Sequence, residues 1–414
     1  MPPVRASFLA LLPVALAANL LVSHYSGNLY SLSLGTEGGG NGTLSIQQTL
    51  RAGGVMPSWL TLDAASGSLY VTDESNFGGS SLTQLSVSAD GTLQTGAVAR
   101  ASGGELHSCL YGGSDGKGFL AAAEYDPSSI STWKLPLSSS TQSLQRMTFT
   151  MDGRGPVPSR QDKPHPHSTF TDPTGQFLLS ADLGADLIRV FRIDADTGHL
   201  ASCGNFSTGP GDGPRHGAWW IPGGTNNSSS SSKQGVPGTT LYIVNELANS
   251  VTVWQVTYSL PSGGASSSSS SSSSSCLTLS KTQSIPTHAQ GVTPGPGSKA
   301  AEVQVAGDFL YAANRNDKLF GPTSDSVATY AIDPRSGSLS FVESTDTHTY
   351  FPRTFQINRA GDLVAFGGQT SSTVAIVARD ASTGRLGGLV ATLAVGRPGT
   401  VNNEDGLSAV IWLE

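Results

Sequence analysis

The chain has little cysteine, little charge and no apolar run long enough to cross a bilayer. Its three cysteines, Cys109, Cys203 and Cys276, permit at most one internal disulfide and exclude a disulfide framework. Charged residues make up 13% of the 414 residues, and a net charge of -7 without a basic stripe argues against nucleic-acid binding. No segment shows the 3.6-residue apolar period of a helix, and 50 glycines and 23 prolines would interrupt one. The chain is therefore predicted to be all-β.

What the chain does contain is a repeat. Seven segments open with an apolar run, and after a short polar gap each is followed by a second β-rich segment. The apolar runs begin near Leu20, Leu69, Phe119, Phe177, Leu241, Leu310 and Leu363. A unit of about fifty residues built only of short strands cannot bury its own faces and must stack on its neighbours. The repeat predicts a seven-bladed β-propeller with four antiparallel strands per blade.

The two ends of the chain predict how the ring closes. The segment from Leu20 to Tyr25 resembles the second strand of a repeat, whereas Gly406 to Glu414 resembles a first strand. We expect the C-terminal strand to pair with the N-terminal blade, which removes the exposed edges that an open sheet must protect.

The domain organisation follows from composition. Residues 1–18 carry one positive charge, an apolar centre and an Ala-x-Ala arrangement, as in a secretory signal peptide. Residues 19–414 are expected to form a single propeller domain, with Ser-rich inserts at about 225–233 and 262–275 as disordered loops. Four Asn-x-Ser/Thr sequons agree with a secreted or cell-wall-associated glycoprotein, and a cytoplasmic location is the alternative. The sequons are at Asn41, Asn205, Asn226 and Asn227.

Ionisable residues stand at equivalent places in the repeats. The heads of the predicted first strands carry His107, His165, His167, Arg215, His216, Glu302 and Arg353, and the ends of the second strands carry Glu74, Glu124, Asp182, Glu246 and Arg315. Because first strands lie nearest the axis of a propeller, we expect these side chains to converge on one mouth of the central channel. Guanidinium groups there would bind a small anionic or oxygen-rich ligand. Some of them are expected instead to tie neighbouring blades together.

Several motifs, taken in order, resemble one family. They are Lys163-Pro164-His165-Pro166-His167, Asp182-Leu183-Gly184-Ala185-Asp186, Gly213-Pro214-Arg215-His216, Tyr242-Ile243-Val244-Asn245-Glu246-Leu247, Ala301-Glu302-Val303 and Tyr311-Ala312-Ala313-Asn314-Arg315. Together they resemble the 6-phosphogluconolactonase-type seven-bladed propellers, a family that also contains the fungal carboxy-cis,cis-muconate cyclases. The resemblance runs over essentially the whole chain after the signal segment.

The resemblance implies lactone chemistry without a metal or another cofactor. It implies catalytic roles for Glu246 and for His165 or His167, of which we expect only one to face the channel. In the hydrolytic direction the histidine, oriented by Glu246, would activate water. The substrate-binding candidates are Arg215, Arg315, Arg353, His216 and Glu302.

Three functions are consistent with these residues. The first is a lactonase that hydrolyses a small anionic or sugar lactone to the hydroxy acid. The second is a cyclase that closes a lactone from a carboxymuconate, and the third is a secreted glycoprotein that binds a ligand without turnover. The expected partner is a small lactone or carboxylate, and the sequence leaves the oligomeric state open. The sequence contains no His-Glu-x-x-His and no Cys-x-x-Cys, so no metal site is expected.

Overall fold

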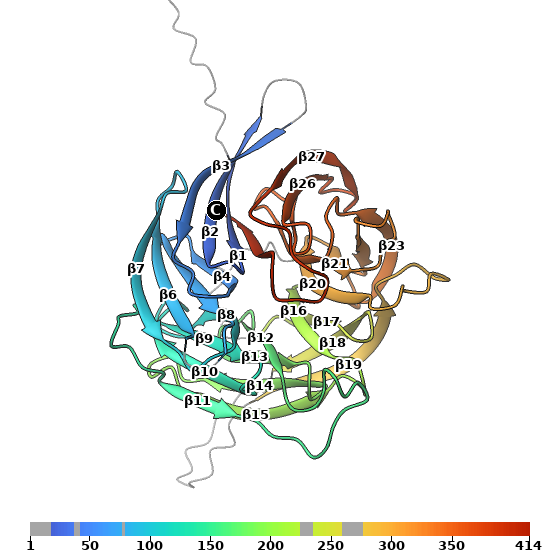
Figure 1. The fold of residues 1–414 in the computed structure, drawn as a ribbon. Helices are drawn as coiled ribbons and strands as arrows, with labels where there is room; N and C mark the ends of the chain where they lie inside the picture. Colours follow the sequence, from blue (N-terminus) through green and yellow to red (C-terminus); the bar gives the residue numbers. More distant parts are fainter. Residues whose placement is uncertain (1–17, 37–41, 77–78, 224–234, 259–275) are drawn as a thin grey trace, which may run out of the picture.

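The protein folds into seven four-stranded sheets arranged around a central axis (Figure 1). The computed structural model describes residues 18–36, 42–76, 79–223, 235–258 and 276–414. All but the last residue of the expected signal segment, and both Ser-rich inserts, lie outside the described residues. Every regular element among the described residues is a strand, and each sheet is antiparallel. The predicted seven-bladed β-propeller is confirmed. No helix in this part of the chain is long and apolar enough to cross a membrane.

Each blade runs outward from the axis in four strands, and the blades are numbered here along the chain. Blade 1 contains β28 (Leu407–Trp412), β1 (Ala18–His24), β2 (Asn28–Thr36) and β3 (Gly42–Arg51). Blade 2 contains β4 (Pro57–Asp63), β5 (Ser68–Asp73), β6 (Ser81–Val87) and β7 (Leu93–Arg100); blade 3 contains β8 (Glu105–Tyr111), β9 (Phe119–Glu124), β10 (Ser129–Lys134) and β11 (Gln145–Thr148). Blade 4 contains β12 (Pro166–Thr171), β13 (Phe177–Asp182), β14 (Leu187–Ile193) and β15 (Leu200–Ser207); blade 5 contains β16 (Pro214–Trp220), β17 (Thr240–Asn245), β18 (Ser250–Tyr258) and β19 (Leu277–Pro286). Blade 6 contains β20 (Lys299–Ala306), β21 (Phe309–Arg315), β22 (Ser326–Ile332) and β23 (Leu339–Asp346); blade 7 contains β24 (Pro352–Ile357), β25 (Leu363–Gly368), β26 (Thr373–Arg379) and β27 (Leu386–Ala394).

The C-terminal strand closes the ring, as predicted. β28 pairs antiparallel with β1, with Trp412 opposite Leu20 and Val410 opposite Val22. On either side, the last strand also bonds to the neighbouring blades. The Ser408 hydroxyl donates to the carbonyl of Pro57 on β4 at 2.5 Å, and Trp412 Nε1 donates to the carbonyl of Gln356 on β24 at 2.8 Å.

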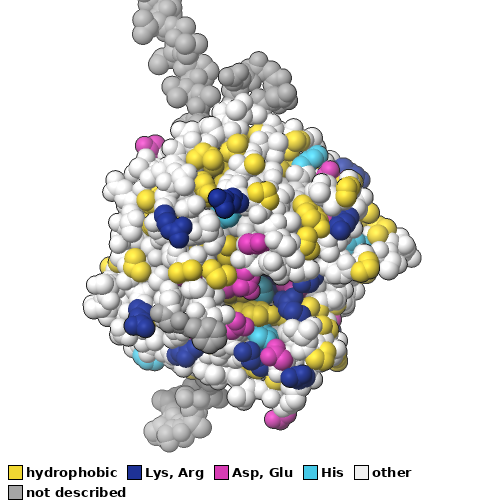
Figure 2. Space-filling view, viewed as in Figure 1, with side chains coloured by type: hydrophobic (Ala, Val, Ile, Leu, Met, Phe, Trp, Pro, Cys, Tyr) yellow, Lys and Arg dark blue, Asp and Glu magenta, His cyan; other side chains and the backbone are white. Residues whose placement is uncertain are grey.

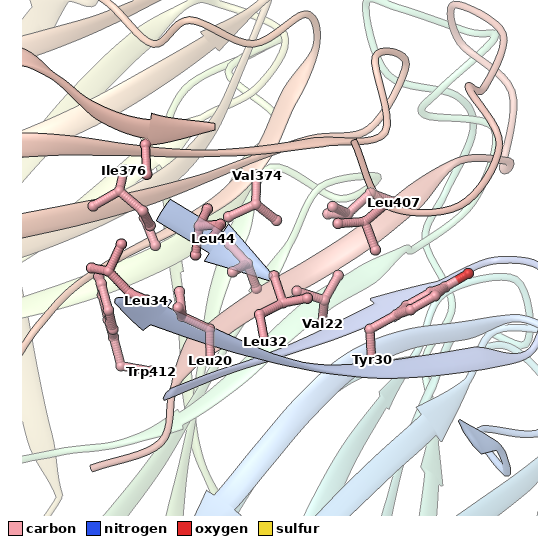
Figure 3. Close-up of a cluster of buried hydrophobic side chains, with 14 residues drawn as sticks. Leu20, Val22, Tyr30, Leu32, Leu34, Leu44, Val374, Ile376, Leu407 and Trp412 are labelled. Atoms are coloured by element: carbon pink, nitrogen blue, oxygen red, sulfur yellow. The ribbon is translucent and has the colours of Figure 1, made fainter. Parts of the chain in front are cut away.

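The core lies between the faces of adjacent sheets. Blade 1, which holds both terminal strands, shares a cluster with blade 7 in which Leu20 and Trp412 pack with Val374 and Ile376 of β26 (Figure 3). All four side chains are at most 3% exposed. Burying apolar area of this kind is the main stabilising contribution to a closed ring, because no blade covers its own faces.

Glutamine side chains connect the outermost strands of adjacent blades. The amide group of Gln283 on β19 donates to the carbonyl of Leu339 on β23 at 2.8 Å and accepts from its N–H at 2.8 Å. The same pair of bonds joins Gln48 to Leu93 and Gln145 to Leu200. We call these three contacts the glutamine bridges.

One disulfide also joins neighbouring blades. Cys203 on β15 is bonded to Cys276, the residue before β19, so the outermost strands of blades 4 and 5 are covalently linked. Cys109 remains a free thiol.

Candidate active site

A β-bulge near the start of the innermost strand recurs from blade to blade and places the site residues. In blade 4, Pro166 pairs with Asp182 and Ser168 with Ala181, which leaves His167 unpaired between them. The same shift leaves Arg215 unpaired in blade 5 and Arg353 in blade 7. A bulge bends its strand and re-aims the extra side chain, so residues at this position turn toward the channel axis.

His167 and Arg353, but not Arg215, line a cavity that we call the cationic cavity. Its volume is about 320 Å³, and ionisable side chains gather around the hollow at the centre of the face drawn in Figure 2. Its walls include four cations and three carboxylates, each contributed by a different strand or connection. The cations are Arg160, Lys299, Arg315 and Arg353, and the carboxylates are Glu74, Glu246 and Glu404.

Glu246, which follows β17, stands at the centre of the arginine cluster. Its Oε1 contacts Arg160 Nη1 at 2.5 Å, and its Oε2 contacts Arg215 Nε at 3.0 Å and Arg315 Nη2 at 2.7 Å. Burial alone would raise the pKa of Glu246, but the three guanidinium groups overcome it and hold that pKa well below its usual range. One carboxylate cannot neutralise three cations, so the cluster keeps a positive charge.

The arginine cluster also has unused hydrogen-bond donors. Arg215 is fully buried, and its Nη1 donates to the carbonyl of Ala301 at 2.8 Å, while its Nη2 has no partner in the part of the chain that the structure describes. Arg315 is 5% exposed, and its Nε has no partner. Buried donors are rarely left unsatisfied, and Arg315, which lines the cationic cavity, would donate to an anion that enters it.

Of the two candidate histidines, His167 lines the cationic cavity and His165 does not. The His167 ring is 4% exposed, and its buried Nδ1 has no hydrogen-bond partner among the described residues. Burial, followed by the charges of Arg215 and its neighbours, lowers the pKa of His167 well below the usual histidine value. The imidazole is therefore neutral near pH 7 and can accept a proton.

His165 ties two blades together instead. Its ring stacks on Tyr125 with the centroids 4.2 Å apart, Nδ1 donates to the Tyr125 carbonyl at 3.1 Å, and Nε2 contacts Asp162 Oδ1 at 2.9 Å. Both ring nitrogens are occupied, so this side chain has no nitrogen left for a substrate.

Arg353 belongs to a second ion pair in the same cavity. Its Nη2 lies 3.5 Å from Glu74 Oε2, which also accepts a hydrogen bond from the Tyr25 hydroxyl at 2.8 Å. Burial raises the pKa of Glu74 to about 7. The longer, weaker pairing leaves Arg353 more available to a ligand than the arginines around Glu246.

The expectation of a single mouth is wrong, because the candidates divide between two cavities. His216 and Glu302 line a second cavity of about 370 Å³ on the channel, together with His107. His107, Ser168 and His216 each directly follow an unpaired bulge residue. Successive side chains of a strand point in opposite directions, so these three side chains turn away from the cationic cavity that the bulge residues face. His216 Nδ1 lies 3.0 Å from Glu302 Oε2.

Glu246 also differs from its expected role. Its two oxygens are engaged by arginines, so the carboxylate positions guanidinium groups and does not orient the histidine.

Comparison with known proteins identifies the family of the chain. A family model described as a seven-bladed β-propeller lactonase matches residues 19–403. The chain belongs to this lactonase family.

The similar proteins carry related names. An Arthroderma benhamiae protein described as "Probable 6-phosphogluconolactonase" is 30% identical over 330 residues, covering 80% of this chain and 75% of that protein. The 6-phosphogluconolactonase of Bacillus subtilis is 28% identical and covers 68% of each chain. In fold, the periplasmic gluconolactonase of Pseudomonas aeruginosa superposes with a TM-score of 0.73 at 23% identity, covering 96% of this chain and 99% of that one.

Sequence reasoning missed two cations of this lactonase-family site. Arg160 lies in the long connection between β11 and β12, and Lys299 opens β20. Arg160 lies outside the repeat, and Lys299 opens its strand at a place where four of the other blades have proline, so the repeat pattern did not point to them. The length of the β11–β12 connection was the available signal, since long loops in compact domains often carry function.

The chain contains one Gly-x-Ser-x-Gly pattern, the sequence that surrounds the nucleophilic serine in many hydrolases, but its serine does not lie in either cavity. Ser114 of Gly112-Gly113-Ser114-Asp115-Gly116 is exposed in the turn between β8 and β9 and lines neither cavity. Among the described residues, no group of three or more His, Cys, Asp or Glu side chains is arranged to hold a metal ion.

Proposed function

We propose that this protein is a lactonase that hydrolyses a small anionic lactone in the cationic cavity without a metal ion. One observation carries the proposal. A neutral imidazole, His167, lies in the same cavity as an arginine cluster with excess positive charge and an unpartnered Nε–H on Arg315. The names of relatives from Arthroderma benhamiae and Bacillus subtilis support a 6-phosphogluconolactonase-like substrate.

The residues divide the reaction between them. Arg353 and Lys299 bind the anionic substituent, and Arg315 donates to the lactone carbonyl oxygen. His167 takes a proton from water as the resulting hydroxide adds to the carbonyl carbon. Arg315 then stabilises the oxyanion, because a preorganised donor in a dry site interacts most strongly with the charge that develops. When the ring C–O bond breaks, the alkoxide takes the proton back from the imidazolium, which leaves the hydroxy acid.

The arginine cluster takes the place that a metal ion would otherwise have in polarising the carbonyl group. It is already assembled around Glu246 before a substrate arrives, so little reorganisation is needed. A carboxymuconate would also satisfy these cations, and the cyclase reaction is the competing outcome of the experiment below.

The test is a panel of sugar lactones, phosphorylated and neutral, with a carboxymuconate as a further substrate, assayed with and without EDTA. We expect acid release from the phosphorylated lactone that survives the chelator. His167→Asn should lower kcat by about 10² to 10⁴, the usual contribution of general base catalysis. His199→Asn, in an exposed turn, is the control and should leave kcat unchanged.

The pH profile adds a second readout. Because the pKa of His167 is lowered, the acidic limb of kcat/KM should lie below about pH 6.5. Loss of activity with EDTA, or full activity in the His167→Asn variant, would contradict the proposal. Turnover of the carboxymuconate alone would replace it with the cyclase.

A further inference from the structure

The second cavity is built like a binding site of its own. It measures about 370 Å³, within the range of about 300 to 1,000 Å³ that is typical of small-ligand sites. Trp59, Trp219 and Phe170 supply aromatic walls. The Trp219 indole is held in place, because its Nε1 donates to the carbonyl of Thr171 at 2.9 Å. Trp59 packs on the His107 ring with the centroids 4.1 Å apart.

The polar groups of this cavity have hydrogen-bonding capacity to spare. Ser168 is 1% exposed, and its hydroxyl has no partner although the residue lines the cavity. His107 Nδ1 accepts a hydrogen bond from the Thr169 N–H at 3.3 Å, which leaves Nε2–H of the neutral ring as a donor. Glu302 adds two oxygens beside His216.

The electrostatics disfavour a charged ligand of either sign. None of the residues that line the second cavity is Lys or Arg, and Glu302 is the one carboxyl group among them, so an anion finds no counter-charge. A cation is opposed by Arg215, whose charge, after burial, is the largest influence lowering the pKa of His216. Burial raises the pKa of Glu302 to about 8, so this carboxyl group is itself mostly neutral near pH 7.

We propose that the second cavity binds a neutral, polyhydroxylated saturated ring, such as an aldopyranose or a cyclic polyol, between Trp59 and Trp219. The C–H bonds of such a ring carry partial positive charge and pack on the negative faces of aromatic rings. Its hydroxyl groups donate and accept, and so match Ser168, His107 and Glu302. This site is separate from the cationic cavity and does not depend on the lactonase reaction.

The test is calorimetric titration of the full chain with D-glucose and with myo-inositol. We expect saturable binding of at least one of them. Ser168→Ala should weaken it about threefold to tenfold, the effect of one hydrogen bond. Ser180→Ala is the matched control, because Ser180 on β13 is also buried with an unpartnered hydroxyl but lines neither cavity. Trp219→Ala, at a half-buried position, should abolish binding.

Charged analogues test whether the second cavity prefers a neutral ligand. A competitor tests whether the ligand binds in the cationic cavity instead. D-glucosamine, protonated at about pH 6, and D-glucuronate should bind more weakly than D-glucose. Inorganic phosphate at saturation should not displace the neutral ring, since phosphate would occupy the cationic cavity. The proposal is overturned by the absence of saturable binding, by equal losses in the two serine variants, by tighter binding of a charged analogue or by competition from phosphate. A failure of the lactonase assays would leave these results unaffected.

Discussion

At the scale of single residues, Glu246 is the group on which the cationic cavity depends. It is 1% exposed and is the shared partner of Arg160, Arg215 and Arg315. Removing one partner of a buried ion pair costs much more than the pair contributes, because the remaining charge stays buried without compensation. Here three guanidinium groups would lose the same partner.

We therefore predict that Glu246→Ala lowers the free energy of unfolding by about 3 to 5 kcal/mol. Urea denaturation measures this change. Inorganic phosphate should raise the stability of the variant more than that of the natural protein, because an anion can replace the missing carboxylate. Glu343→Gln, which alters a partly exposed pair with Arg385, should cost at most about 1 kcal/mol. A Glu246→Ala protein that is as stable as Glu343→Gln would contradict this account.

At the scale of elements, the strands follow from the sequence, but their irregularities do not. The expectation that only one of His165 and His167 faces the channel did not follow from strand alternation, because residues two apart on a regular strand point to the same side. The two side chains part because His165 lies before β12 and the bulge leaves His167 unpaired. The sequence also placed His216 with Arg215, but His216 lines the second cavity, whereas Arg215 is the unpaired bulge residue, is fully buried beside Glu246 and lines neither cavity.

The glutamine bridges also could not be predicted from the sequence. Gln283 and Leu339 are 56 residues apart, and a polar side chain on an outer strand usually faces water. Only the stacking of blades brings the amide group to the backbone of the next sheet.

Gln283→Ala should lower the free energy of unfolding by about 1 to 3 kcal/mol, since two hydrogen bonds to backbone groups are lost. Gln283→Glu keeps the acceptor but not the donor. Its stability should fall between that of the natural protein and that of the Gln283→Ala variant. The control is Gln47→Ala on β3, whose exposed amide bonds only to Ser45 of its own strand. Thermal denaturation of the three variants checks the order, and equal midpoints for Gln283→Ala and Gln47→Ala would refute it.

At the scale of the whole molecule, the fold was predictable because it is repetitive. Seven similar units and two complementary ends leave few alternatives to a closed ring, and the structure has that ring. The division of the channel into two cavities was not predictable, because it depends on how side chains from non-consecutive blades meet at the axis. For example, the rings of Trp59 on β4 and His216 on β16 contact each other across the axis, with their centroids 5.3 Å apart.

Closure makes the last strand essential to the molecule. We predict that a chain lacking residues 408–414 does not fold, and that Trp412→Ala lowers the free energy of unfolding by about 3 to 5 kcal/mol. Trp412 is 3% exposed and packs between the first and last blades. Leu389→Ala, at an exposed site on β27, should change stability by less than about 0.5 kcal/mol. Circular dichroism of the truncated chain, and denaturation of the two variants, test this expectation; a folded truncated chain would disprove it.

The recurring bulge has a consequence for how such a protein can change over evolutionary time. A side chain that has no partner in the ladder can be exchanged without disturbing the register of its blade. His167, Arg215 and Arg353 occupy such positions, and Leu106 occupies the equivalent one in blade 3, where it forms an uncharged part of the cationic cavity wall. Where such a residue lines the cavity without a buried ion pair, as His167 and Leu106 do, its replacement can change the ligand preference while the blade keeps its register.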